Sequence, residues 1–308
     1  MSQSRRLYDD DAVSDMSYLN TAKAHHEILE TGGQLVETNH NAYLEELKKD
    51  LTVMSHHPNE LVNFKLNCLK TRSSLYDSEA LQIGLASVLL IDSFNKRRLL
   101  KTIIYYANKT HDFIDNFNVN IQSNDSLTLV LKPETIYTTV EPGRQIKQQV
   151  ISLPQIIPFE SPKLLGNYEF NHRQYNFGFH FPSLITKFME FKFVDLGTFE
   201  RQWQKNTDNI LKTDLILLDS NIVSAGHDFK KYFNYLVDLK IMDEYDYIQG
   251  RKSLDLGGLF ELDVVDVEYL LKISVFPSRK ATFQIVADKK DFEVAKFILE
   301  TLVFLFKA

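Results

Sequence analysis

The stretch "QYNFGFHF" (Gln174–Phe181) decides the fold of this chain, because its large side chains alternate with a period of two residues. Tyr175, Phe177, Phe179 and Phe181 are separated by polar residues or glycine. Strict alternation over this length predicts a strand that is buried on one face. The preceding "NHR" predicts a hairpin turn after the strand-like run "LLGNYEF", so the two runs are expected to pair antiparallel.

Similar runs fill the rest of the region from residue 80 to residue 181. They are "LLKTIIYYAN", "FNVNIQ", "LTLVL" and "QIKQQVISL". Because the runs follow one another without intervening helices, they predict an antiparallel, immunoglobulin-like β-sandwich over residues 76–182.

The pattern changes after Pro182. Helices are expected over residues 198–206 and 228–242, and strands at "GGLFELDVVD", "EYLLKISVF" and "ATFQIVAD". At the C-terminus, Asp291 can cap a final amphipathic helix. Strands grouped with flanking helices predict an α+β subdomain over residues 183–308.

Residues 1–75 are rich in Asp, Asn, Ser and His, with scattered apolar residues. Asn41–Met54 has helical spacing at its leucines, and "TAKAHHEILE" has the pattern of another short helix. This segment is expected to be a hinge or linker, mostly flexible or partly helical, with helices that form transiently or dock on the folded part.

The composition narrows the class of protein. The chain has 308 residues, 44% of them hydrophobic, and a net charge of −6, which argues against broad nucleic-acid binding. Its single cysteine, Cys68, excludes an internal disulfide framework and favours a reducing compartment. The polar N-terminus does not resemble a signal peptide, and the apolar runs are too short for a transmembrane segment. A soluble, cytosolic protein is expected.

Signatures of catalysis are missing from the sequence. It has no Gly-rich phosphate loop, no nucleophile elbow and no paired-cysteine motif. The pairs His25-His26 and His56-His57 lie in the polar N-terminal part without a further ligand, so exposed histidines are favoured over a metal site. Cys68 has no assignable base. We therefore expect no enzyme activity, no metal and no cofactor.

Trp203 is the only tryptophan, and it lies among polar residues in "GTFERQWQKN" (Gly197–Asn206). On a helix, Phe199 would share its face, four residues earlier. Two interpretations stay open: both rings pack inward beneath the helix, or they form a peptide-docking patch.

Several segments together resemble the C-terminal appendage, or ear, of the alpha subunit of the plasma-membrane clathrin adaptor complex. They are "LQIGLAS", "YYANKT", "GRQIKQQV", "FPSLITKF", "FERQW", "YLLKI" and the C-terminal helix, in the family's order over about residues 76–308. The resemblance implies a β-sandwich followed by a platform of sheet and helices, with residues 1–75 in the place of the family's hinge. The family's helical trunk is missing, so a C-terminal fragment or a reduced protein is expected.

The resemblance implies a peptide site on the platform for DPF, DPW and FxDxF motifs. Trp203 matches the family's floor tryptophan, and Phe199 matches the first member of an aromatic pair whose second member is Glu200 here. One of three family arginines matches Lys272, while the others fall at Gln284 and Asp288. The acidic residues Glu200 and Asp288 would repel an acidic ligand.

The resemblance also implies a second site on the sandwich, for WxxF-type motifs that add to a strand edge. Tyr105, Asn108 and Gln145 match that region, whereas a lysine expected nearby is Ala86 or Ser87. Strand addition depends largely on main-chain hydrogen bonds, so it tolerates such changes.

The expected function is therefore recruitment of endocytic accessory proteins in clathrin-mediated endocytosis and vesicle transport. The chain would lie in the cytoplasm, peripheral at clathrin-coated pits of the plasma membrane, with other adaptor subunits joined through a trunk. Clathrin itself is a possible partner, because "LILLD" (Leu215–Asp219) and "LFELD" (Leu259–Asp263) fit the clathrin-box pattern, although buried strands are favoured there. The alternatives are a structural ear that has lost its peptide site, and an ear of another coat, such as that of the coatomer gamma subunit.

Overall fold

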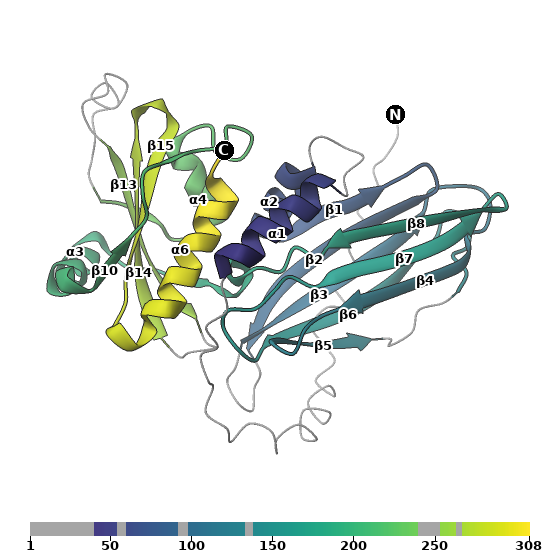
Figure 1. Cartoon of the computed structure of the whole chain (residues 1–308), viewed down its shortest axis with the longest axis horizontal. Coiled ribbons are helices and arrows are strands. Elements are labelled where there is room, and N and C mark those ends of the chain that lie inside the picture. Colours follow the sequence, from purple (N-terminus) through teal and green to yellow (C-terminus); the bar gives the residue numbers. More distant parts are fainter. Residues whose placement is uncertain (1–39, 54–59, 92–97, 133–137, 240–252, 263–266) are drawn as a thin grey trace, which may run out of the picture. The chain divides into compact units, whose positions relative to one another are not determined.

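The computed structural model describes residues 40–53, 60–91, 98–132, 138–239, 253–262 and 267–308 (Figure 1). Their strands form three antiparallel sheets with five, three and seven members. The two smaller sheets make up a β-sandwich, and the largest sheet carries helices on its two faces (Figure 1). The expected fold class, a sandwich followed by an α+β subdomain, is confirmed.

The sandwich pairs a sheet of order β1-β2-β3-β6-β5 with a sheet of order β4-β7-β8. Its inner faces share one core, in which the rings of Tyr106 and Phe117 meet edge to face at 5.2 Å. The strands are β1 (Arg72–Asp77), β2 (Leu81–Ile91), β3 (Arg98–Asn108), β4 (Asp115–Gln122), β5 (Leu127–Lys132), β6 (Gln145–Pro154), β7 (Lys163–Phe170) and β8 (Arg173–His180).

The β7–β8 hairpin forms where the alternating stretch predicted it. Phe177 and Phe181 are buried, while Tyr175 and Phe179 are half-buried. Asn171 and His172 join the strands as a two-residue turn with φ values of 51° and 58°. Hairpin turns of this length favour positive φ because the resulting twist matches that of the strands.

The platform is built on the seven-stranded sheet, whose main path is β10-β15-β14-β13-β12, with β11 beside β15 and β9 beside β13. Its strands are β9 (Glu190–Lys192), β10 (Ile210–Lys212), β11 (Ile216–Leu217), β12 (Val237–Asp238), β13 (Leu254–Leu262), β14 (Val267–Phe276) and β15 (Lys280–Val286). Short 3-10 turns lie at Ile185–Phe188 (η4), Thr207–Asn209 (η5), Gly226–Asp228 (η6), Pro277–Arg279 (η7) and Lys289–Asp291 (η8). The clathrin-box stretches fall on β11 and β13, as strands were favoured there.

The helices α3 (Leu196–Lys205) and α6 (Phe292–Phe306) lie on opposite faces of this sheet (Figure 1). The expected C-terminal helix is α6, and it buries Ala295, Ile298, Leu299 and Leu302. Asp291 occupies the N-cap position, but its side chain accepts no capping hydrogen bond.

The helix expected over residues 228–242 does not form over that length. Only one turn forms, α4 (Phe229–Tyr232), and Phe233 leaves it with extended backbone angles. Tyr235 then has φ 63°, and the chain continues into β12, which pairs with β13. Pairing with the sheet edge thus overrides the helical spacing; residues 240–242 lie outside the described residues.

Two N-terminal helices are part of the folded unit. In α1 (His40–Val53) the side chains of Leu44, Leu47 and Leu51 are buried, and α2 (Glu60–Leu69) buries Phe64 and Cys68. Both helices contact α6 (Figure 1).

Polar contacts also hold these helices. Tyr43 accepts a hydrogen bond from the backbone N–H of Ser161 at 2.6 Å, and Lys65 donates to the carbonyl of Lys307 at 2.8 Å. The helical part of residues 40–75 is therefore docked on the folded part, one of the two arrangements expected for it, and β1 begins four residues before the expected start of the sandwich. The helix expected over Thr21–Glu30 and the pairs His25-His26 and His56-His57 lie outside the described residues.

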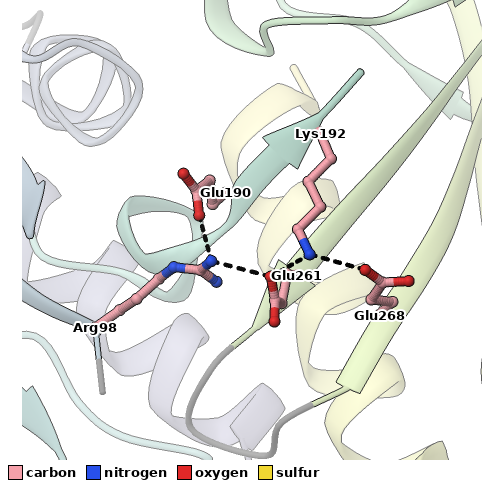
Figure 2. Close-up of polar contacts among 5 residues, drawn as sticks. All are labelled: Arg98, Glu190, Lys192, Glu261 and Glu268. Carbon is pink, nitrogen blue, oxygen red and sulfur yellow. Dashed lines mark hydrogen bonds and ion pairs between the residues drawn. The ribbon is translucent and has the colours of Figure 1, made fainter. Parts of the chain in front are cut away.

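Five charged side chains connect the sandwich strand β3 with the platform (Figure 2). Arg98 at the start of β3 contacts both Glu190 of β9 and Glu261 of β13, the latter at 2.9 Å. Lys192 contacts Glu261 at 2.5 Å and Glu268 at 2.8 Å. Because Lys192 and then Arg98 hydrogen-bond to it, the pKa of Glu261 lies below its usual value.

Candidate functional site

Trp203 and Phe199 lie on α3 and stack on each other. Asp195 caps this helix by accepting a hydrogen bond from the N–H of Thr198 at 2.9 Å. Phe199 is buried, Trp203 is half-buried, and their ring centroids are 5.6 Å apart at an interplanar angle of 17°. Each of the two alternatives drawn from the sequence therefore applies to one ring. Phe199 packs inward, and Trp203 keeps an accessible face.

A glycine in the sheet lets α3 come this close. A Cβ atom on Gly257 of β13 would lie 2.8 Å from Cζ of Phe199 and 2.6 Å from a methyl group of Leu239. Phe199 joins Val194, Leu270 and Val286 in a small core that Trp203 covers in part. The indole therefore rests on a packed apolar base rather than on a mobile loop.

Lys272 of β14 lies beside the indole. Its Nζ is 6.0 Å from the ring centroid of Trp203, which is within the range of a cation–π contact. The same Nζ is 3.2 Å from Asp255, a buried residue that also accepts a hydrogen bond from Ser253 at 2.8 Å. Asp255 was not predicted, and it neutralises part of the positive charge that Lys272 presents to a ligand.

The register places Gln284 of β15 next to Lys272, and it also places Lys212 of β10 next to Gln284. Lys212 is exposed, and it adds a positive charge to this row. Lys212 could not be identified from the sequence, because β10 is only three residues long and the partner residue Gln284 lies 72 residues later. Only the pairing of β10 with β15 reveals it.

The two acidic residues of the expected rim are exposed. Glu200 precedes Trp203 by three residues on α3, so it lies on a neighbouring position of the helix surface. Asp288 follows β15 at the start of η8. The structure thus brings Phe199, Trp203, Lys272 and Gln284 together, with Glu200 beside them.

The residues expected to form the sandwich site divide into two groups. Tyr105 is half-buried and carries Lys147 over its ring at 5.6 Å, and Gln145 is exposed at the start of β6. Lys147 supplies a cation beside Tyr105, whereas Ala86, where a lysine was expected, pairs with Ile103.

Asn108, by contrast, is buried and serves the loop that follows β3. Its amide donates to the carbonyls of Asp112 and Val140, and its oxygen accepts from the N–H and the hydroxyl of Thr110. These four bonds use the full capacity of the amide. The strand edge expected for peptide addition is not found at β3, because β3 lies between β2 and β6.

Other chemistry is poorly supported in the described part of the chain. No group of three or more His, Cys, Asp or Glu side chains is placed to hold a metal there. Cys68 is buried, and burial raises the pKa of its thiol, which disfavours the reactive thiolate. Among the described helices, none has the length and apolar character needed to cross a membrane.

Comparison with known proteins gives a partial sequence match. No family model matches the chain. A 144-residue part, 47% of this chain, is 29% identical to the AP-2 complex subunit alpha-2 of Dictyostelium discoideum. The match covers 14% of that subunit, so the chain corresponds to a small part of its length. It agrees with the resemblance seen in the sequence and supports a clathrin-adaptor appendage.

Comparison with solved structures gives partial matches. The GAE domain of GGA2p from Saccharomyces cerevisiae is 16% identical with a TM-score of 0.30, and the match covers 37% of this chain and 97% of that domain. The yeast GGA1 GAE domain is 23% identical with a TM-score of 0.28, covering 36% of this chain and 99% of that domain. A FixG-related protein of Vibrio parahaemolyticus is 14% identical with a TM-score of 0.21, and the match covers 32% of this chain and 94% of that protein chain.

Proposed function

We propose that this chain is an appendage of the alpha-adaptor type, which binds short linear peptides at the face of α3 that carries Trp203. The observation that carries the proposal is the half-buried indole stacked on buried Phe199, with Lys272 at its side. A tryptophan fixed on a packed base offers a rigid apolar surface, and such residues dominate the energy of many small interfaces.

The charges around the indole favour a ligand that combines an aromatic side chain with one acidic residue. Lys272 shares its charge with Asp255, so Lys212 supplies the more accessible cation in the row. Glu200, which is exposed and three residues before Trp203 on α3, acts against an acidic ligand. We expect DPF- or FxDxF-like peptides to bind modestly, because a short disordered peptide is ordered on binding and buries little area.

In this role the protein would not be an enzyme. It would gather endocytic accessory proteins, and clathrin would be a further candidate partner, in the cytoplasm at plasma-membrane coated pits. Several motifs in one partner would raise the overall affinity through avidity. A weaker site around Tyr105, Lys147 and Gln145 on the sandwich is part of the proposal, whereas Asn108 is not, since its amide is satisfied internally.

A structural role is the second candidate, and a specific observation favours it. The buried carboxylate of Asp255 lies 3.2 Å from Lys272, and Glu200 is exposed beside Trp203, so the acid-binding capacity of the site is reduced. In that case the appendage would contribute to the coat through packing alone.

Calorimetric titration of the full chain with DPF, DPW and FxDxF peptides separates the two candidates. Trp203→Ala should weaken binding about tenfold or more, the loss typical of a central aromatic contact. Lys212→Glu should weaken binding of an acidic peptide but not of its Asp→Asn counterpart. Absence of binding at about 1 mM peptide, with circular dichroism unchanged, would leave the structural role.

A further inference from the structure

The outward face of the five-stranded sandwich sheet carries a row of three apolar residues and one lysine. Val88 of β2, Lys101 of β3, Ile151 of β6 and Val130 of β5 are direct cross-strand neighbours. The next residues along β3 and β6, Thr102 and Val150, point into the sandwich core and are buried. The row therefore lies on the opposite, solvent side of the sheet.

Adjacent positions extend this row into a patch. Ile103 lies two residues along β3 from Lys101, and Leu90 of β2 pairs with Leu99. Val88 is 51% exposed, Leu90 39% and Val130 40%, and Ile103 and Ile151 are half-buried. A sheet with one solvated face ordinarily presents polar residues there, so a contiguous apolar patch indicates an interaction surface. We call Val88, Leu90, Ile103, Val130, Ile151 and Lys101 the outer apolar face.

The charges on this side of the sheet have one sign over four of its five strands, while on the fifth, β1, Asp77 pairs with the outward residue Gln82. The register directs Lys101 and Lys147 outward, and none of the outward positions of β2, β3, β5 and β6 is Asp or Glu. The chain as a whole has a net charge of −6, so this surface differs from the average surface of the protein. Positive and apolar groups together complement a partner that is acidic and apolar.

The backbone of the sheet decides the form of that partner. Across the row, β3 and β6 each have a neighbour on both sides, so their N–H and C=O groups are used within the sheet. A peptide cannot add as a strand at β3 or β6, because strand addition needs a free edge, and the edge strand next to the row is β5. An amphipathic helix satisfies its own backbone and packs with its apolar side chains alone. An anionic bilayer is a poorer fit, because the net negative charge opposes its approach over a longer range.

We propose that the outer apolar face docks an acidic amphipathic helix of a partner protein. This surface lies on the sandwich and does not include Trp203, Lys272 or any other residue of the platform site. It would give the appendage a second kind of contact, with a helix rather than with an extended motif.

A designed peptide tests the proposal on the full chain. A labelled helix of about 18 residues, with Leu on one face and Glu elsewhere, is titrated with protein and followed by fluorescence anisotropy. The matched control peptide has Lys in place of Glu. Saturable binding of the Glu peptide alone is expected, with Ile151→Ser and Lys101→Glu each weakening it about tenfold. The control variants Lys280→Glu and Trp203→Ala should bind the peptide as the original protein does.

Several outcomes would overturn the proposal. They are no binding at about 1 mM, equal binding of the two peptides, and equal binding by the original protein and Lys101→Glu. Lys101 is on the surface, so this variant tests the contact even if Ile151→Ser does not fold. Cosedimentation with vesicles of phosphatidylserine and phosphatidylcholine, lost in Lys101→Glu, would assign the face to membranes instead. Because the Trp203→Ala variant is a control here, failure of the platform site and failure of this face are distinguishable.

Discussion

The position of Phe199 shows how a glycine, Gly257, can determine the geometry of a candidate site. The ring fills the space above Gly257, where a Cβ atom would lie 2.8 Å from Cζ and 2.9 Å from Cε1 of the ring. Contacts this short do not occur for real Cβ atoms, so any larger residue at 257 must displace the ring or the helix. The position of Trp203, which stacks on Phe199, depends on the same contact.

We therefore predict that Gly257→Ala lowers the free energy of unfolding by about 1–3 kcal/mol, as overpacking of a closed site does. Urea denaturation followed by Trp203 fluorescence measures this loss, and the emission of the folded variant should also change.

Gly197→Ala is the matched control in the same region. A Cβ atom there would be 3.5 Å from the nearest atom, and the residue lies on exposed α3, where alanine is favoured over glycine by about 0.5–1 kcal/mol. This variant should be as stable as the original protein or more stable. Equal losses in both variants would contradict the assigned role of Gly257.

At the scale of elements, the pair α1–α2 is docked on the folded part, which is one of the two arrangements expected for this segment. Leu47 of α1 is 1% exposed and Cys68 of α2 also 1%, which are values of core residues. These side chains belong to the same apolar core as the platform helix α6. A helix that is buried to this extent contributes to the stability of the whole folded unit.

Leu47→Ala is accordingly expected to lower the free energy of unfolding of the full chain by about 2–4 kcal/mol, the range for truncating a buried leucine. The exposed neighbour Glu45 offers the control, since Glu45→Ala should change the value by less than about 0.5 kcal/mol. Chemical denaturation provides both numbers. A loss at Leu47 no larger than that at Glu45 would mean that α1 is not part of the cooperative unit.

The junction of α1 with β8 also predicts a dependence on pH. His180 is buried, with the edge of Phe64 against it and Asp50 3.5 Å from its Nε2. Burial, and then Lys163, lower the pKa of this imidazole, while Asp50 and Glu46 oppose the shift. The unfolded chain therefore binds the proton more tightly than the folded chain does.

It follows that the contribution of neutral His180 to stability is fully present above about pH 6.5, the ordinary pKa of histidine. This contribution falls as the pH decreases below that value. Asp50, whose pKa is lowered chiefly by its hydrogen bond to Lys163, loses its contribution only at more acidic pH. Unfolding free energies at about pH 7 and about pH 5.5 should differ less in His180→Phe than in the original protein. The exposed His111→Asn should keep the full difference, and a similar pH dependence in all three proteins would remove His180 from the explanation.

At the scale of the whole molecule, the charges in Figure 2 link the sandwich to the platform. The side chain of Arg98 is 10% exposed, and it contacts carboxylates from two platform strands. Charged groups removed from water must keep their partners, because an unpaired buried charge is costly. The link is therefore specific in position even where its net contribution to stability is small.

A double-mutant cycle measures this link. We expect Arg98→Ala and Glu261→Ala to show a coupling energy of about 1–2 kcal/mol in the free energy of unfolding. The exposed pair Lys109–Asp77, at 2.6 Å, is the reference, and its coupling should be below about 1 kcal/mol because solvent screens it. A coupling for Arg98–Glu261 that does not exceed the reference value would mean that the network does not join the two parts energetically.

Local patterns in the sequence were sufficient where one face of an element is buried and the other is not. The alternation through Phe177 predicted β8, and the helical spacing around Leu47 and Ile298 predicted α1 and α6. The pairing of Phe199 with Trp203 also followed from helical spacing, because residues four apart share a face. These features depend on periodicity, which a single segment contains in full.

Tertiary structure alone decided the features that depend on register and on packing between distant segments. Lys212 lies next to Gln284 because β10 pairs with β15, and Asp255 contacts Lys272 from the neighbouring strand. The strand β12 forms in the second half of an expected helix. The segment against which α1 and α2 dock, and the interior place of β3, belong to the same class. Each depends on which strand or helix lies next to which, and the physical reason is that periodicity specifies the buried face of an element but not the partner that covers it.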